Sequence, residues 1–169
     1  VRIVHYPGPV LLTKARRVDA APPDLAEMVA GMRRAMAFER GIGLAAPQVG
    51  ISLRLLLANP TGAEKDELVL LNPEITGRHG KREWAEEGCL SFPGIWGDVL
   101  RYTQVDVSYQ DASMAKKTLA AEGLMARVLQ HEIDHLDGVL FVTKMRPGDK
   151  AAAQAKLREL RDEYEGKRP

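Results

Sequence analysis

Two histidines spaced four residues apart, His131 and His135, constrain the fold of this chain more than any other feature. They share one helical stripe with Leu124 and Val128, and Gly138 ends the pattern. Positions i and i+4 of a helix lie on one face, so both imidazoles can bind one metal ion. The alternative is a pair of buried histidines whose ring nitrogens are satisfied by hydrogen bonds. The inward stripe favours the metal.

Glu132 lies beside these histidines and is suited to accept a proton. A carboxylate held near a metal, but not bound to it, can take a proton from metal-bound water. The other polar residues of the segment fall on a second stripe, which comprises Arg127, Gln130, Asp134 and Asp137. We therefore expect a helix with an inward chemical face and a separate polar face.

A hydrolytic metal site normally has three protein ligands and an open position for water, so the two histidines need a third partner. The metalloprotease pattern H-E-x-x-H-x-x-G-x-x-H would place that ligand at Phe141, which cannot ligate, and this family is excluded. Two alternatives remain. Cys89 offers a thiolate suited to iron or zinc, although a lone cysteine is also consistent with a buried structural thiol. The glutamates of the C-terminal segment lie in a charge-alternating run typical of a solvated face: Glu159, Glu163 and Glu165.

The composition fits one domain, residues 1–169, and excludes several classes of protein. Twenty-four Lys and Arg residues against 23 Asp and Glu leave a net charge of +1, which gives no sign of a nucleic-acid substrate. The single Cys89 cannot form an intramolecular disulfide, so we expect a reducing compartment. No apolar run approaches the ~18 residues that a membrane span requires, and the N-terminal segment lacks a signal-peptide core. We expect a cytoplasmic protein that does not bind membranes.

The periodicity of apolar residues predicts three helices and a group of strands. The helices span residues 24–39, 124–136 and 148–165, and the strands span 51–58, 67–76 and 99–109. A loop covers residues 59–66. Because helices occur at both ends and in the middle, with strands grouped between them, the expected fold class is α+β. In this fold, antiparallel sheets pack around a central metal-binding helix, with a first helix near the N-terminus and a C-terminal helix.

The segment GIGLAAPQ, residues 41–48, superficially matches the dinucleotide-binding fingerprint G-x-G-x-x-A. Its context excludes that function, because it follows a predicted helix and Pro47 forbids the helix that should bind the phosphates. Two interpretations remain open. The segment is a plain turn, or its glycines let a substrate backbone approach while Gln48 donates an amide hydrogen to a developing oxyanion.

Three segments together resemble the three motifs of the peptide deformylase family. They are GIGLAAPQ (41–48), EGCLSFP (87–93) and QHEIDHLDGVLF (130–141), in the family's order and approximate spacing. The resemblance covers nearly the whole chain, including an N-terminal segment around Gly8 to Leu11 and Ala15, and the short gap between the first two motifs is of the bacterial type. The chain departs from the family at Tyr102, where proline is common, at Met114, where glycine is frequent, and at Val142-Thr143, where an Asp-Arg pair is common.

The resemblance implies a metal-dependent hydrolase that removes the formyl group from the N-terminal methionine of newly made polypeptides. It assigns one divalent ion to Cys89, His131 and His135, with Fe(II) preferred and Zn, Ni or Co as substitutes. Glu132 would be the proton acceptor. Gln48 and the backbone N–H of Leu90 would stabilise the oxyanion.

The same resemblance implies how the substrate binds. The backbone of Ile42, Gly43 and Leu44, and the backbone near Glu87, would pair with the substrate as an added strand. The methionine side chain would lie among Ile42, Leu90, Leu124, Arg127 and Val128. Nascent formyl-methionyl chains are the expected partners, and contact with the ribosome through the C-terminal helix is a further hypothesis.

Two other functions remain as alternatives. One is a zinc endopeptidase with a glutamate as third ligand. The other is a catalytically inactive homologue that binds nascent chains or the ribosome through its last helix.

Overall fold

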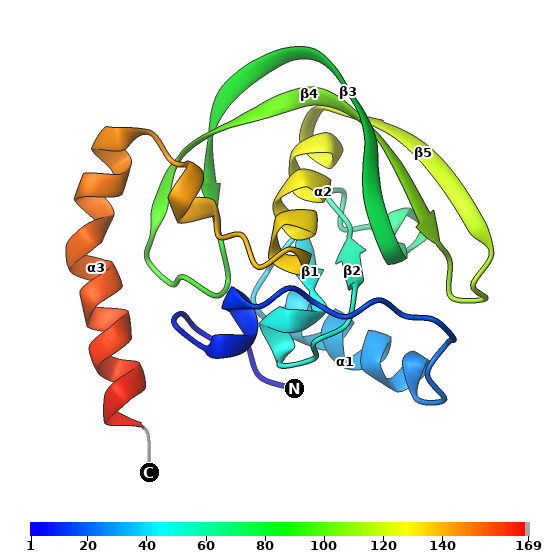
Figure 1. Cartoon of the computed structure of the whole chain (residues 1–169), viewed down its shortest axis with the longest axis horizontal. Helices are drawn as coiled ribbons and strands as arrows, with labels where there is room; N and C mark the ends of the chain where they lie inside the picture. The colour runs from blue at the N-terminus through cyan, green and yellow to red at the C-terminus, as the bar shows by residue number, and fades with distance from the viewer. Residues whose placement is uncertain (168–169) are drawn as a thin grey trace.

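The structure is a computed structural model that describes residues 1–167 (Figure 1). Its α-helices are α1 (Leu25–Phe38), α2 (Gly123–Leu136) and α3 (Pro147–Gly166). Its strands are β1 (Gly43–Ala45), β2 (Leu55–Ala58), β3 (Leu68–Gly88), β4 (Trp96–Gln110) and β5 (Lys116–Glu122). Short 3-10 helices occur at Pro9–Leu12, Ala46–Val49, Glu64–Asp66 and Phe141–Lys144. The helices predicted for 24–39, 124–136 and 148–165 are therefore confirmed.

The strands form one antiparallel sheet in the order β1-β2-β3-β4-β5. The long β3–β4 ladder runs from the pair Leu71–Gln110 to the pair Gly88–Trp96, with three shifts of register along it. Such irregularities bend and twist a ladder. Figure 1 shows β3 and β4 arching over α2. The α+β class is confirmed, with one strongly bent sheet in place of separate sheets.

Helix α2 lies at the centre of the fold, as predicted. Its apolar residues Ala126, Leu129, Ile133 and Leu136 are buried in a cluster with the inner side chains of the sheet, which include Leu56, Leu70, Val105 and Val107. A helix that is covered on several sides holds its side chains in fixed rotamers. The two histidines of α2 are therefore carried by a helix that is packed into the core.

The strand predictions were partly wrong, for reasons visible in the burial pattern. The predicted strand 67–76 continues to Gly88, but the residues from 78 to 84 are all exposed, so they carry no alternation of apolar and polar residues. Strands β1 and β5 were not predicted. β1 has three residues, and β5 buries only Ala121 while Leu119 is partly buried. Residues 51–54 precede β2 and are outside the ladder.

Two departures from the family pattern have local structural consequences. Met114 has a φ of 65°, a left-handed conformation that glycine adopts without steric cost. Tyr102 donates its backbone N–H to Oε1 of Gln130, at 3.0 Å, a bond that a proline at this position could not make. The Gln130 amide in turn donates to the Tyr102 carbonyl at 2.9 Å. The prediction of a separate polar face on α2 is therefore corrected for Gln130, which is buried against β4.

Helix α3 lies at one side of the molecule (Figure 1). It docks through one narrow stripe, as predicted, because its buried residues are Ala153, Leu157 and Leu160. These pack in a cluster that also contains Phe92 and Phe141. None of the helices within residues 1–167 has the length and apolar character that crossing a membrane requires.

Candidate metal centre

Three predicted ligands converge at the end of β3 and on the inner face of α2. Cys89 directly follows β3, whereas His131 and His135 are buried on α2. One ligand atom from each residue lies within 4.8 Å of the other two, and the Sγ of Cys89 is 3.2 Å from Nε2 of His135. Among the described residues, this is the one cluster of potential metal ligands. A thiolate with two imidazoles is a donor set that suits iron or zinc.

The surroundings of the two histidines shift their pKa values in opposite directions. Burial alone would lower the pKa of His131, but its hydrogen bonds to Cys89 and Glu87 raise that pKa well above the ordinary value. The surroundings of its ring thus favour positive charge. Burial, together with the charges of His131 and Arg101, lowers the pKa of His135 and keeps that ring neutral. A neutral imidazole is the form that binds a metal.

Glu87 determines which nitrogen of His131 faces the cluster. Its Oε1 lies 2.8 Å from Nδ1 of His131. Burial would raise the pKa of Glu87, but hydrogen bonds from His131 and Arg101 and their charges outweigh burial and hold it well below its ordinary value. Because the ionised carboxylate only accepts, Nδ1 is the protonated nitrogen and donates to it. Nε2 of His131 is left for a metal, as in carboxylate–histidine–metal triads.

Glu132 has a buried carboxylate and lines the same pocket as Cys89 and His131. Its side chain is buried, and its Oε2 has no hydrogen-bond partner. Burial is the largest cause that raises the pKa of Glu132, to about 7. A divalent cation nearby would lower it again, which keeps the carboxylate able to accept a proton at neutral pH. An unpartnered buried oxygen is rare in native proteins and calls for a functional explanation.

Gln48 contacts Cys89 through its side-chain amide. Its side chain is buried, and Oε1 accepts the backbone N–H of Ala45 at 2.8 Å. That bond turns the amide group so that Nε2 lies 3.5 Å from Sγ of Cys89 and 3.4 Å from Oγ of Ser91. Gln48 is therefore held with its donor directed toward the cluster.

The glycines of the first motif provide room for protein side chains. A Cβ at Gly43 would lie 2.9 Å from Oε1 of Glu132 and 2.7 Å from Cγ1 of Val128. A Cβ at Gly41 would lie 2.9 Å from a methyl group of Leu90. The sequence interpretation considered only the approach of a substrate. The structure shows that the glycines also let β1 and its preceding loop pack against the site.

A pocket of about 460 Å³ opens beside the cluster. Its wall includes nearly all of the predicted substrate residues, together with Cys89, His131, Glu132 and Gln48: Ile42, Gly43, Glu87, Leu90, Leu124, Arg127 and Val128. Leu44 is the exception, because the whole residue is buried in the core and does not line the pocket. Trp96, which is 64% exposed, also lines the mouth of the pocket.

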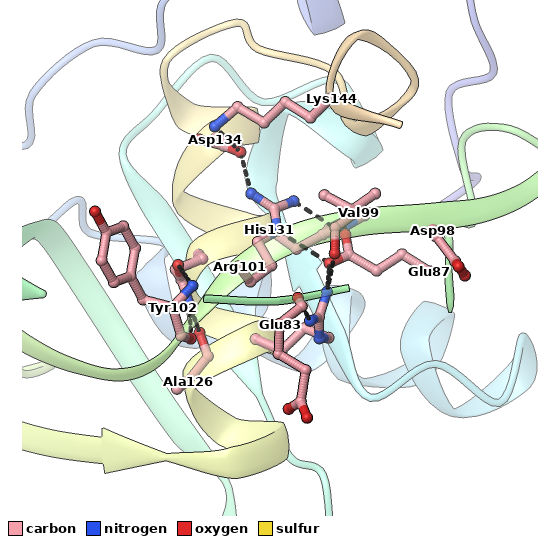
Figure 2. Close-up of polar contacts among 12 residues, drawn as sticks. Glu83, Glu87, Asp98, Val99, Arg101, Tyr102, Ala126, His131, Asp134 and Lys144 are labelled. Atoms are coloured by element: carbon pink, nitrogen blue, oxygen red, sulfur yellow. Dashed lines mark hydrogen bonds and ion pairs between the residues drawn. The ribbon is translucent and has the colours of Figure 1, made fainter. Parts of the chain in front are cut away.

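A buried charge network behind the pocket was not predicted from the sequence (Figure 2). Arg101, on β4, forms ion pairs with both Glu87 and Asp134. Arg127 was predicted to lie beside the methionine side chain. Its guanidinium donates hydrogen bonds to the Glu87 carboxylate and to the carbonyls of Val99 and Glu83. The sequence does contain a sign that Arg101 is buried. Inward and outward side chains alternate along β4, and this alternation puts Arg101 on the inward face with Val99 and Val105. A cation at such a position requires a buried acid.

The glutamates considered as third ligands do not reach the cluster. Glu159, Glu163 and Glu165 are exposed on α3, and none belongs to the group of ligand atoms around Cys89. The hypothesis of an endopeptidase with a glutamate ligand therefore has no support in the geometry.

Comparisons with known proteins point to one family. Residues 1–151 match the family model described as polypeptide deformylase. The chain is 38% identical to chloroplastic peptide deformylase 1B of Oryza sativa subsp. japonica, covering 98% of this chain and 62% of that protein. It is 42% identical to the peptide deformylase of Desulforudis audaxviator, covering 85% and 92%. The solved structure of peptide deformylase from Plasmodium falciparum is similar, with 38% identity, a TM-score of 0.95 and 99% of both chains covered.

Proposed function

Because this chain belongs to the peptide deformylase family, we propose that it hydrolyses the N-formyl group of formyl-methionine at the start of newly made polypeptides and releases formate. The observation that carries this proposal is a Cys-His-His cluster with two buried histidines, beside a mostly apolar pocket that Glu132 also lines with a carboxylate whose Oε2 has no hydrogen-bond partner.

We infer that Cys89, His131 and His135 hold one divalent ion, with Fe(II) as the working metal and Zn, Ni or Co as substitutes. When bound, such an ion supplies Lewis acidity, which polarises a carbonyl oxygen and makes water a stronger acid. One thiolate and two neutral imidazoles leave a divalent ion with net positive charge, as this chemistry requires.

The chain's own groups would carry the proton and the developing charge. Glu132 accepts a proton from the attacking water through its Oε2 and delivers it to the amine that leaves. The amide of Gln48 and the backbone N–H of Leu90 donate to the oxygen of the formyl carbonyl as it becomes an oxyanion. The bond from Ala45 fixes the Gln48 amide beforehand, so no reorganisation is needed during the reaction.

Two strand edges beside the pocket would hold the substrate backbone. β1 is the edge strand of the sheet, and its Gly43 lines the pocket. The end of β3, from Glu86 to Gly88, also lines the pocket and pairs only with β4. A short peptide laid between these edges gains main-chain hydrogen bonds without regard to its sequence. Selectivity for methionine would come from the apolar wall formed by Ile42, Leu124 and Val128.

The expected setting is a reducing compartment such as the bacterial cytoplasm, because Cys89 must remain a thiolate to bind a metal. Nascent formyl-methionyl chains are the substrates in this proposal. Contact with the ribosome would use the exposed face of α3, and sedimentation of the protein with ribosomes, with and without residues 147–169, tests that part separately.

The deciding experiment measures formate release from a formyl-Met peptide by protein loaded anaerobically with Fe(II). Cys89→Ala should lose both metal and activity, because it removes a charged ligand from a three-ligand site. Full metal content and turnover in Cys89→Ala would overturn the ligand assignment. A parent protein that binds metal and formyl peptide but releases no formate would favour the inactive-homologue hypothesis.

A further inference from the structure

We propose that Arg101 is a positioning residue of the metal centre. It fixes the carboxylate that orients His131, and it ties the segment that carries Cys89 to the helix that carries both histidines. This inference rests on the proposed function, because it takes Cys89, His131 and His135 as the metal ligands.

The guanidinium of Arg101 donates hydrogen bonds to both carboxylate oxygens of Glu87. Its Nε donates to Oε2 at 2.9 Å and its Nη2 donates to Oε1 at 3.0 Å, and the two side chains are only 3% and 6% exposed. A planar fork on a planar carboxylate fixes the plane of the carboxylate as well as its position. The same Oε1 accepts Nδ1–H of His131. Arg101 thus determines the direction from which the ring of His131 is held.

The remaining nitrogen of Arg101 reaches α2 directly. Its Nη1 donates to Oδ2 of Asp134 at 2.6 Å, and Asp134 lies between the two histidines in the sequence. The Nζ of Lys144 also forms an ion pair with Oδ2 of Asp134, at 2.9 Å. Figure 2 shows Arg101 between Asp134 on the helix and Glu87.

The position of Glu87 in the chain gives this bridge its importance. Glu87 precedes Cys89 by two residues on the same segment. The thiolate and the imidazoles belong to different elements, so their spacing depends on how firmly β3 is joined to α2. The buried guanidinium of Arg101 bonds to both elements, through Glu87 and Asp134, in addition to the bonds that Arg127 of α2 makes to β3. Ligand spacing and ring orientation therefore depend on the same side chain.

Arg127 contacts the same carboxylate in a less restrictive way. Its Nη1 reaches Oε2 of Glu87 at 2.7 Å, and its side chain is 15% exposed. A contact to one oxygen leaves the carboxylate free to rotate about that contact. We expect Arg127→Gln to disturb the metal less than Arg101→Gln does.

The test measures metal release with Co(II) as the probe. Co(II) bound through Cys89 has a thiolate-to-metal absorption band, and loss of that band in excess chelator gives the release rate. Changes to groups that orient metal ligands typically cost ~10–100-fold in metal affinity or activity, and we expect Arg101→Gln to release Co(II) faster by a factor in this range. Arg101→Lys should show a smaller increase, because an ammonium lacks the planar fork.

Arg54 provides a matched control. It is an arginine with a 12% exposed side chain, and it also binds α2, through the Leu136 carbonyl at 3.0 Å and Asp137 at 2.9 Å. It makes no contact with Glu87. Arg54→Gln should lower the thermal midpoint and leave the Co(II) release rate at the parent value. Equal release rates in Arg101→Gln and Arg54→Gln would mean that Arg101 is merely structural.

A double-mutant cycle tests the route of the effect. If Arg101 acts through Glu87, then Arg101→Gln should add little to the release rate of Glu87→Gln. Fully additive effects would overturn the proposal. Should Arg101→Gln fail to fold, Arg101→Lys is compared with Arg54→Lys, and equal release rates in that pair count against the proposal just as firmly.

The same measurements separate this inference from the function it rests on. A parent protein that binds Co(II) without the thiolate band would refute the Cys89 ligand, and with it the proposed metal centre. A parent with the band, whose Arg101 variants release Co(II) as the Arg54 controls do, would refute the role of Arg101 alone.

Discussion

Replacing Gly43 by alanine tests how closely the site depends on the space beside Glu132. The added Cβ would lie 2.7 Å from Cγ1 of Val128, 2.9 Å from Oε1 of Glu132 and 3.0 Å from its Cγ. Because non-bonded carbon atoms prefer about 3.5–4.0 Å, these neighbours must move by roughly 0.5–1 Å. Glu132 is buried and α2 is covered on several sides, so the carboxylate has little room to move without leaving its position.

The expected effect follows from that displacement. A misplacement of about 1 Å at a reacting group can cost ~10²-fold in rate, which corresponds to about 2.7 kcal/mol of transition-state stabilisation. Overpacking of a filled interior typically also costs about 1–3 kcal/mol of folding stability. We expect Gly43→Ala to fold, with a lowered thermal midpoint, and to lose kcat more than KM changes.

The assay compares formate release, metal content and thermal midpoint on one preparation. Gly148→Ala is the matched control, because a Cβ at Gly148 in α3 has no atom within 4 Å. If Gly43→Ala turns over as fast as Gly148→Ala, the reasoning from the crowded Cβ is refuted. If only KM rises, the methyl group narrows the pocket beside Val128 without displacing Glu132.

Three further predictions address the base, the pocket and the stability of one turn. Glu132→Gln should keep its metal and its thermal midpoint while kcat falls ~10²–10⁴-fold; loss of metal would instead identify Glu132 as a ligand. Formyl-Met peptides should have a higher kcat/KM than formyl-Asp peptides, because the apolar wall penalises a desolvated charge; a flat order would refute the pocket assignment. The hydroxyl of Ser113 is the largest cause that lowers the pKa of Asp111, aided by backbone N–H groups. The ionised form of Asp111 therefore stabilises the fold. In urea unfolding at pH 7, Asp111→Asn should be less stable than the parent. That difference should shrink as the pH falls below 3.8, the ordinary pKa, and an unchanged difference would contradict the assignment.

The helices and the closeness of the two histidines were predictable because they depend on local patterns. The stripe of Leu25, Val29, Met32 and Met36 in α1 repeats at helical spacing, and its burial is as expected. The i and i+4 spacing of His131 and His135 brings two ligand atoms together within a single helix. The family resemblance then supplied Cys89, which spacing alone left open.

The rest depends on how distant segments meet, and no local pattern contains that information. Residues 78–84 of β3 pair with β4 through their backbone groups, although their side chains are exposed to water. The role of Arg101 requires the register that puts it opposite Glu83 and near Asp134 at once. Glu87 was expected to contribute backbone near the substrate, and that expectation stays a prediction, whereas the contacts with His131 and Arg101 belong to its side chain.

The order of the strands has a consequence for how the chain matures. Each strand of the sheet pairs with the one that precedes it in the chain, so the sheet can grow by pairing neighbouring segments as they leave the ribosome. Its inner apolar side chains, such as Leu56, Leu70 and Val105, remain uncovered until α2 follows β5. Both histidines arrive on that same helix. Burial of these apolar side chains and assembly of the candidate metal cluster therefore both depend on α2.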